Sequence, residues 1–407
     1  MYPASRGAAR DDGACELRVM GVLVNGAALQ APALREGFYR ELAARAARYR
    51  LKVVLVCVSN RKERGLPPDV RCCSLHGGVW SGMEDEDLRL DAVYDRFFAR
   101  RRGEAAAAAR FLRESERRWG CARLGETLPD KWTVHLALRG DPHIRPLLPA
   151  TAPFDAARLP DWLSRSGGRL LLKPSAGMQG RGVLALRRLA GGALEAAGRD
   201  GRNRCMRAVF GDVGECADWL AGRTARPYLA QRLLDLQDGE GRPFDVRLLV
   251  QKDGGGRWQA TGSALRLGRT GGITSNLHGG GVAEEPLPFL TRLFGAERAG
   301  SLLGGIEAAG LRIVRRLECR FGRLAELGLD FGIDPAGRIW FLEANAKPGR
   351  SAFRRLGGPA ARLSVERPLQ YARYLLSRRG ARVPRVPRSP GTVSVGTSKD
   401  HVQEVHV

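Results

Sequence analysis

LGLDFGIDPAGRIWFLEANAKPG, residues 327–349, is the stretch of this chain that carries the strongest fold signal. Apolar runs lie on both sides of the turn sequence DPAG at 334–337, so we predict a β-hairpin. Asp330 precedes Glu343 by 13 residues and Glu343 precedes Asn345 by two, so the last two side chains share one strand face. If Asp330 ends the neighbouring strand, all three converge as oxygen ligands, and such a small set suits Mg²⁺. A hairpin with exposed acids is the alternative interpretation.

A second signal is the segment LLLKPSAGMQGRGV at 170–183, which predicts a strand that opens into a glycine-rich loop. The glycines Gly177, Gly180 and Gly182 allow backbone amides to curl around phosphate oxygens, and Lys173 at the strand end can reach the same phosphates. The spacing matches neither a P-loop nor a Rossmann turn. A tight hairpin would account for the same glycines.

The basic residues of the chain are almost all arginines. Only seven of the 67 lysine and arginine residues are lysine, and the arginines that produce the net charge of +24 are scattered along the chain. Because the basic residues form no focused stripe, this composition disfavours a nucleic-acid partner. An acidic substrate is at least as compatible with the positive charge. A lysine that remains in such a sequence indicates a place where a compact point charge is needed. Lys131, Lys173 and Lys347 stand out for this reason.

The N-terminal part of the chain alternates strand and helix patterns. Valine-rich runs at 17–24 and 51–58 flank a helical pattern at 37–50, which predicts a strand, helix, strand unit with a parallel sheet. Residues 90–98 predict a later strand that runs into a helix, and residues 103–120 are strongly helical by propensity. We therefore expect an α/β domain over residues 15–125.

The remainder predicts an α+β unit with two lobes, over 126–228 and 229–375. The predicted elements of the first lobe are a helix at 130–140 and a strand at 168–174. Those of the second are strands at 228–236, 244–252, 258–267 and 338–345 and a helix around 301–320. We expect a flexible N-terminus at 1–14 and, because no apolar period continues, a disordered tail at 376–407.

Composition and cysteine usage suggest a cytoplasmic protein. No apolar run reaches the roughly 18 to 20 residues that cross a bilayer, and the first residues lack the apolar core of a signal peptide. The eight cysteines show no paired spacing of the kind that holds zinc, so we interpret them as reduced thiols. The sequence does not indicate an oligomeric state.

These segments together resemble the ATP-grasp superfamily and, within it, the endospore-coat-associated YheC/YheD family. The resemblance covers about residues 129–352, in the family's order, through DKWTVHLAL, LPAT, LLLKPSAGMQGRGV, GRPFDVRLLVQK, WQATGSALRL and LGLDFGIDPAGRIWFLEANAKPGRS. SNLHGGG at 275–281 resembles the substrate-side loop of ribosomal-protein glutamate ligases. The resemblance implies an α/β pre-ATP-grasp domain followed by a two-lobed α+β ATP-grasp fold.

The resemblance also implies residues that hold the nucleotide. Lys131 and Lys173 would contact the phosphates of ATP. The loop that closes over these phosphates would consist of Ala176, Gly177, Met178, Gln179, Gly180 and Gly182. The hinge against the adenine would consist of Gln231, Arg232, Leu233 and Leu234, with Asp238 at the ribose. The chain departs from the family at this hinge, because glutamine replaces the family's acidic residue at position 231.

Three further sets of residues follow from the same resemblance. Asp330, Glu343 and Asn345 would hold Mg²⁺, with Mn²⁺ as an alternative ion. Arg247 and Arg266 would act as catalytic residues against the transferred phosphate or an acyl-phosphate, and Asp245 would orient Arg247 or contact the substrate. The substrate loop would consist of Asn276, His278, Gly279 and Gly280.

The function that this resemblance implies is a Mg-ATP-dependent carboxylate–amine ligase. A small-molecule or peptide carboxylate would be activated as an acyl-phosphate, and an amine would then displace the phosphate to form an amide. Two alternatives remain open at this stage: a non-catalytic ATP-binding protein associated with the spore coat, and an ATP-grasp kinase. The sequence does not name the carboxylate or the amine.

Overall fold

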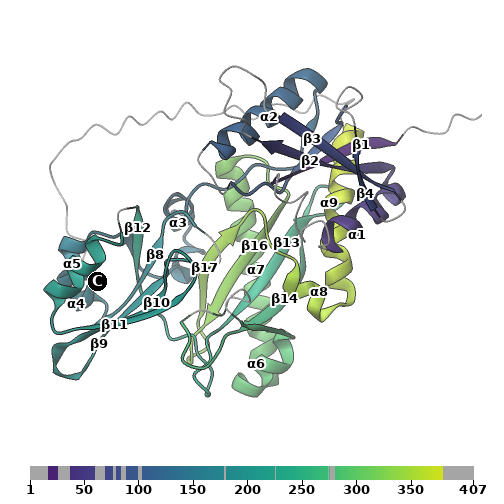
Figure 1. Ribbon diagram of the computed structural model, residues 1–407. Helices are drawn as coiled ribbons and strands as arrows, with labels where there is room; N and C mark the ends of the chain where they lie inside the picture. Colours follow the sequence, from purple (N-terminus) through teal and green to yellow (C-terminus); the bar gives the residue numbers. More distant parts are fainter. Residues whose placement is uncertain are drawn as a thin grey trace, which may run out of the picture.

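The computed structural model describes residues 17–25, 37–59, 69–76, 79–83, 89–99, 103–177, 180–224, 226–273, 275 and 280–378. Three β-sheets organise these residues, with the N-terminal sheet at the upper right of Figure 1, the second sheet at the left and the third in the centre. The expected flexible N-terminus and the tail beyond residue 378 lie outside the described residues. No helix in the described ranges has the length and apolar character to cross a membrane.

The N-terminal sheet has six strands in the order β4-β3-β2-β1-β5-β6. The strands are β1 (Arg18–Asn25), β2 (Leu51–Ser59), β3 (Asp69–His76), β4 (Val79–Met83), β5 (Ala92–Asp95) and β6 (Ala122–Arg123). β1 runs parallel to both β2 and β5, which confirms the predicted parallel unit, whereas β3 and β4 add an antiparallel edge that the sequence did not predict.

The helices of this domain are α1 (Gly37–Ala46), the 3₁₀ turn η3 (Ala47–Tyr49) and α2 (Glu104–Trp119). α2 confirms the helix predicted at 103–120. The helix predicted directly after β5 is absent from residues 96–99, which are irregular. The apolar residues that suggested it are used for burial instead, since Phe97 packs into the core beside α2.

The second sheet has six antiparallel strands in the order β11-β10-β9-β8-β12-β7. The strands are β7 (Thr151–Pro153), β8 (Arg169–Pro174), β9 (Leu184–Arg188), β10 (Leu194–Arg199), β11 (Cys205–Phe210) and β12 (Tyr228–Arg232). The helical elements are η6 (Ala156–Arg158), α4 (Leu159–Arg165), η7 (Ala190–Gly192) and α5 (Val213–Ala221). Leu170 and Leu172 pack against α4 and α5, so strand alternation turns Arg169, Leu171 and Lys173 to the opposite face.

The third sheet has five strands in the order β15-β14-β13-β16-β17. The strands are β13 (Phe244–Lys252), β14 (Trp258–Leu267), β15 (Val282–Glu284), β16 (Glu326–Ile333) and β17 (Ile339–Asn345). β16 and β17 form the predicted hairpin, and Gly337 closes it by donating its N–H to the Asp334 carbonyl at 2.8 Å. Gly337 has φ +74°, a left-handed conformation that glycine adopts without strain.

Helices cover both faces of the third sheet. They are α3 (Lys131–Arg139), η5 (Arg145–Leu147), α6 (Pro286–Phe294), α7 (Ala296–Phe321), α8 (Ser351–Leu356) and α9 (Gly358–Ser377). α3 and α7 contribute to the main core on one face, whereas Phe353 of α8 packs on Leu249 and Ala264 on the other. α9 extends two residues into the predicted tail and packs Val365 and Leu369 into the core of the N-terminal sheet.

A buried polar network joins the N-terminal sheet to the third sheet. Glu326 on β16 accepts hydrogen bonds from the Tyr94 hydroxyl at 2.5 Å, Arg96 Nη1 at 3.0 Å and Gln251 Nε2 at 2.9 Å, and it also pairs with Arg350. Burial alone would raise the pKa of Glu326, but the guanidinium groups of Arg350 and Arg96 outweigh burial and lower it. The carboxylate therefore stays charged and holds the two sheets together.

We predict that Glu326→Gln lowers the free energy of unfolding by about 3 to 5 kcal/mol, because it leaves two buried guanidinium groups without their carboxylate. Urea denaturation followed by circular dichroism measures this difference. The matched control is Glu307→Gln on the exposed face of α7, which we expect to change stability by less than about 0.5 kcal/mol. Equal midpoints for Glu326→Gln and wild type would contradict the structural role of the network.

Candidate functional site

A cleft lies between the second and third sheets and has an empty volume of ≈ 1190 Å³, which includes space open to solvent. Most of the described residues that the sequence predicted for the site line it. They are Lys131, Lys173, Gly177, Gly180, Gln231, Arg232, Leu233, Leu234, Arg266, Asp330 and Glu343. Segments that are far apart in the sequence therefore meet in one cleft.

Other predicted residues lie beside this cleft or outside the described ranges. The described residues that do not line it are Ala176, Gly182, Asp238, Arg247, Asn345 and Gly280. The remaining ones, Met178, Gln179, Asn276, His278 and Gly279, lie outside the described residues. Their roles stay predictions.

Two lysines of the cleft lining approach the strand that carries Glu343. Lys131 is the first residue of α3, whose N-cap Asp130 accepts the Trp132 N–H at 2.9 Å. Lys131 Nζ donates to the Gly177 carbonyl at 2.7 Å and lies 3.8 Å from Glu343 Oε2. Lys173 Nζ donates to the Leu342 carbonyl at 3.3 Å. The cleft thus brings two ammonium groups to the strand that carries Glu343.

The environment of Lys173 shifts its ionisation. Burial lowers the pKa of this lysine to about 8, Lys131 lowers it as well, and Glu343 opposes the shift. An anion in the cleft would favour the charged form of Lys173. The two ammonium groups at this end of the cleft could contact negatively charged groups of a ligand.

The third sheet carries a cluster of charged side chains that lie opposite one another across its strands. Asp245 on β13 pairs in register with Arg266 on β14, and Arg247 pairs with Asp330 on β16. Asp330 lies opposite Glu343 on β17. Because residues two apart on a strand share a face, this register turns all five side chains to one side of the sheet.

Within this cluster the two arginines are bound to two carboxylates. Arg266 donates from Nε and Nη2 to the Asp245 oxygens at 2.6 and 2.7 Å, and its Nη2 lies 2.8 Å from Asp330 Oδ2. Arg247 binds Asp330 through Nε and, at 2.9 Å, through Nη2. Burial alone would raise the pKa of Asp330, but Arg247 and Arg266 outweigh burial and lower it to about 2.

Asp245 is the fourth member of this group, and the sequence left its role open. Its carboxylate accepts hydrogen bonds from Arg266 and from the Ser275 hydroxyl, and within the described part of the chain it makes no hydrogen bond or ion pair with Arg247. Burial raises the pKa of Asp245 above its usual range, although Arg266 opposes the shift. Asp245 thus orients Arg266 and holds Ser275 against the sheet.

The oxygen donors at the β16–β17 hairpin fit a magnesium ion. Asn345 Nδ2 donates to Glu343 Oε1 at 3.1 Å, so the amide oxygen of Asn345 is left to act as an acceptor. A carboxylate has about four lone-pair positions, so Asp330 and Glu343 keep some beyond their present partners. No three histidine, cysteine, aspartate or glutamate side chains form a metal-binding group within the described ranges. The third donor would therefore be the amide of Asn345.

The segment after β12 differs from its prediction. The strand predicted at 228–236 ends at Arg232, and residues 233–236 continue as an irregular segment along the cleft. Gln231 is 4% exposed and donates from Nε2 to Thr151 Oγ1 at 2.8 Å. A hydrogen bond to the neighbouring strand therefore occupies the amide nitrogen at the position where the family has an acid.

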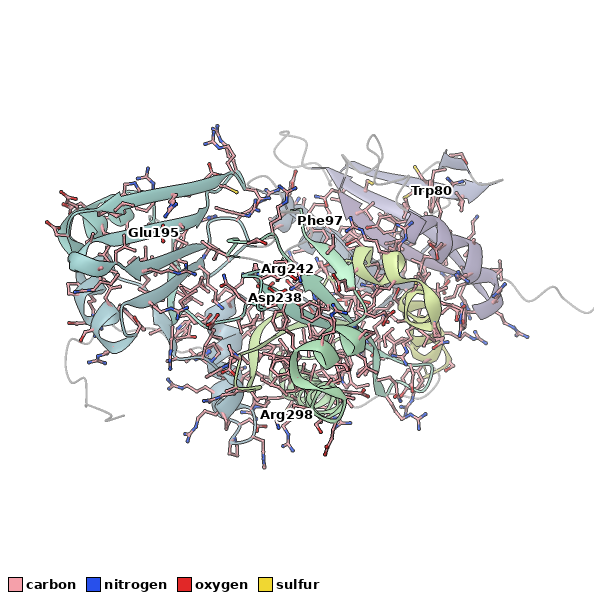
Figure 2. All side chains as sticks on the ribbon, turned by 90° about the horizontal axis from the view of Figure 1, so that it is seen from below. Trp80, Phe97, Glu195, Asp238, Arg242 and Arg298 are labelled. Atoms are coloured by element: carbon pink, nitrogen blue, oxygen red, sulfur yellow. The ribbon has the colours of Figure 1, made fainter. Side chains whose placement is uncertain are left out.

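Asp238 closes a turn and does not line the cleft. Its carboxylate accepts Arg242 Nε at 2.8 Å and the Arg242 backbone N–H at 2.9 Å, and Figure 2 shows the two side chains together. Asp235 lines the cleft three residues earlier. The sequence did not identify Asp235, because the position where β12 ends determines which acid of this segment faces inward.

Sequence reasoning also missed cleft residues on β8 and β9. Arg169 and Leu171 line the cleft together with Lys173, and Arg187 lies opposite Arg169 on β9. A signal for them was available, since residues 169, 171 and 173 alternate along one strand and must share a face with the predicted lysine.

Comparisons with known proteins agree with this architecture. A sequence model of the YheC/D-like ATP-grasp family matches residues 121–375. Endospore coat-associated protein YheC of Bacillus subtilis is 29% identical over 315 residues, which cover 76% of this chain and 84% of YheC. Endospore coat-associated protein YheD of the same organism is 28% identical over 304 residues, which cover 72% of this chain and 65% of YheD.

Two solved structures share the fold at low sequence identity. The D-alanine-D-alanine ligase from Coxiella burnetii has a TM-score of 0.50 and 11% identity, covering 89% of this chain and 97% of that one. D-alanyl-alanine synthetase A from Vibrio cholerae has a TM-score of 0.51 and 10% identity, covering 89% and 99%. At this identity the similarity shows the fold, and it confirms the predicted fold class.

We predict that Lys173 titrates near pH 8, so that its neutral fraction grows as the pH rises through that value, because burial disfavours the ammonium form. Carbon-detected NMR of protein labelled at lysine Cε measures the midpoint, and the spectrum is simple because the chain has only seven lysines. The Lys173→Arg variant assigns the signal by removing it. A midpoint near the ordinary lysine value of about 10.4 would contradict the buried environment.

Proposed function

Because the chain belongs to the YheC/D-like ATP-grasp family, we propose that it binds Mg-ATP between the second and third sheets and uses it to join a carboxylate to an amine. The observation that carries the proposal is the approach of Lys131 and Lys173 to the strand of Glu343 across one cleft. Two ammonium groups facing an acidic hairpin form a site that suits a triphosphate with its cation.

The lining of the cleft supports one orientation of the nucleotide. The phosphates would lie at Lys131 and Lys173, with the glycine-rich loop beside them. The base would lie farther along β8, beyond Leu171. The apolar residues of the whole cleft lining are Leu171, Val183, Leu233, Leu234, Leu236, Phe244, Ile273 and Leu342. A lining that combines apolar side chains with two ammonium groups suits a molecule that has a flat ring and an anionic tail.

The proposed reaction needs charge neutralisation and positioning more than a protein nucleophile. An oxygen of the substrate carboxylate attacks the γ-phosphorus of ATP, the bond to the β,γ-bridging oxygen breaks, and ADP leaves. The amine then attacks the acyl carbon of the acyl-phosphate and displaces phosphate. Lys131 and Lys173 hold the phosphates in place for the first step. A bound Mg²⁺, held by Asp330, Glu343 and Asn345, would supply further positive charge at the phosphate oxygens.

The arginines of the third sheet contribute to this function through Asp330. Arg266 lines the cleft, whereas Arg247 lies outside the lining and clamps the same carboxylate. In this proposal Arg266 would meet the transferred phosphate or the acyl-phosphate, and Arg247 keeps Asp330 ionised and aligned beside Glu343. Asp245 in turn holds the guanidinium of Arg266 in one orientation.

Wild-type protein should release ADP when it is given ATP, Mg²⁺ and the right pair from a panel of amino acids and peptides. Glu343→Gln and Lys173→Ala should each lower that rate by about 10² to 10³, because each removes a preorganised charge next to the phosphates. Glu297→Gln, at an exposed position on α7, is the matched control and should keep the wild-type rate. A coupled ADP assay measures these rates.

The same experiment separates the alternatives. Free phosphate as the product supports the ligase, whereas γ-phosphate that stays on the acceptor identifies a kinase. Nucleotide binding without ADP release, with every acceptor of the panel, identifies a non-catalytic protein that shares the coat association by which YheC and YheD are named. A Glu343→Gln variant with full activity would remove Glu343 from the proposed site.

A further inference from the structure

Resting on the proposed function, we propose that Arg181 is a further catalytic residue, whose guanidinium group contacts the terminal phosphate of the bound nucleotide. Arg181 lies in the glycine-rich loop, is exposed, and lines the cleft together with Gly177 and Gly180. Neither the sequence motifs nor the comparisons assign it a role. The inference depends on which cations of the cleft are already neutralised and which are not.

The arginines on the third sheet supply little net charge to the cleft. Arg247 and Arg266 are bound to Asp330 and Asp245 through two-pronged contacts, so these four side chains sum to zero charge. Lys131 lies 3.8 Å from the carboxylate of Glu343. Lys173, whose ammonium group donates to the Leu342 carbonyl, is one cation at this end, and a terminal phosphate with several negative charges can bind a further cation of the lining.

Arg181 is such a cation. Among the described residues it makes no ion pair within 4.0 Å, and its neighbours Gly180 and Gly182 have φ values of +72° and +74°. Val183 N–H donates to the Gly180 carbonyl at 3.3 Å, and Gly182 N–H donates to the Asp200 carbonyl at 3.2 Å. The backbone around Arg181 is thus held by a turn, while its side chain stays available to a ligand.

Contacts around Gly182 hold this turn in place. A Cβ atom added to Gly182 would lie 2.7 Å from the Tyr228 hydroxyl and 2.7 Å from Arg226, so both side chains would have to move. The φ of +74° at Gly182 favours glycine independently of these contacts.

The other unpaired arginines of the lining lie at the far end of β8. Arg169 is opposite Arg187, and Arg232 is opposite Leu170, so all three belong to the same level of the second sheet. Four residues separate Arg169 from Lys173, which corresponds to about 13 Å along a strand. These arginines are therefore next to the base end of the cleft, and Arg181 remains the candidate at the phosphate end.

The chemistry of this contact involves no proton transfer by the arginine. The guanidinium donates hydrogen bonds to the γ-phosphate oxygens while the bond to the β,γ-bridging oxygen breaks and the carboxylate oxygen bonds to phosphorus. ADP takes the electron pair of the broken bond. A planar group with five N–H donors matches two phosphate oxygens at once, which a lysine ammonium does not.

The test compares two nucleotides that differ in the terminal phosphate, β,γ-imido-ATP and ADP, each with Mg²⁺ and by calorimetry. We expect Arg181→Ala to lower affinity for β,γ-imido-ATP by about tenfold to a hundredfold and to leave ADP affinity within about twofold. Arg181→Lys should recover only part of the loss. Arg188→Ala, at an exposed position on β9 outside the cleft lining, is the matched control and should bind both nucleotides as wild type does.

Each outcome of this comparison bears on the proposal. Equal losses for both nucleotides would show a structural effect of the loop and would overturn it, as would unchanged affinity for both. Because the readout is binding, it does not depend on finding the acceptor. Wild-type protein that binds neither nucleotide would overturn the proposed function together with this inference, whereas intact wild-type binding with no effect of Arg181→Ala would overturn the inference alone.

Discussion

The antiparallel register between β16 and β17 is the constraint on which the site depends. This register places Asp330 opposite Glu343. On its other side β16 pairs with β13, which places Asp330 opposite Arg247. A shift of one residue would turn one member of each pair to the other face of the sheet and separate the carboxylates. The turn at Asp334 leads to the pairing of Phe331 with Phe341, and a β-bulge between Asp330 and Phe331 then shifts the pairing by one residue, which brings Asp330 opposite Glu343. The relative position of the Asp330 and Glu343 carboxylates therefore depends on strand pairing next to the buried side chains of Leu329 and Phe331.

The N-terminal domain supports the same hairpin from outside the cleft. Lys347, two residues beyond Asn345, donates to Asp95 Oδ2 at 2.9 Å and to the Phe97 carbonyl at 2.6 Å. Arg96 Nη2 donates to the Pro348 carbonyl at 3.0 Å. The rarity of lysine drew attention to Lys347, and the structure shows that this ammonium joins two domains. Residues at the carboxyl end of β5 thereby hold Lys347 and Pro348, which directly follow the proposed metal ligands in the chain.

The charges of the site are distributed unevenly between its two walls. The third sheet contributes the carboxylates of Asp245 and Asp330, to which Arg266 and Arg247 are bound. The cleft-lining cations of the second sheet and its glycine-rich loop make no ion pair within 4.0 Å among the described residues. A nucleotide with its cation would complement both walls, because its phosphates meet the second sheet and its metal meets the third. This asymmetry explains why net charge along the sequence indicates little about the site, although the overall charge is +24.

The sequence by itself determined the local features: the hairpin at 327–349, the strand that ends in Lys173, and the type of side chain at each proposed ligand position. These follow from alternation and turn chemistry, which act over a few residues. Only the tertiary structure decided that Asp235 lines the cleft whereas Asp238 closes a turn. It also decided that Arg266 lines the cleft whereas Arg247 does not. Such choices depend on where β12 ends and on pairing between strands far apart in the chain, and no local pattern encodes either.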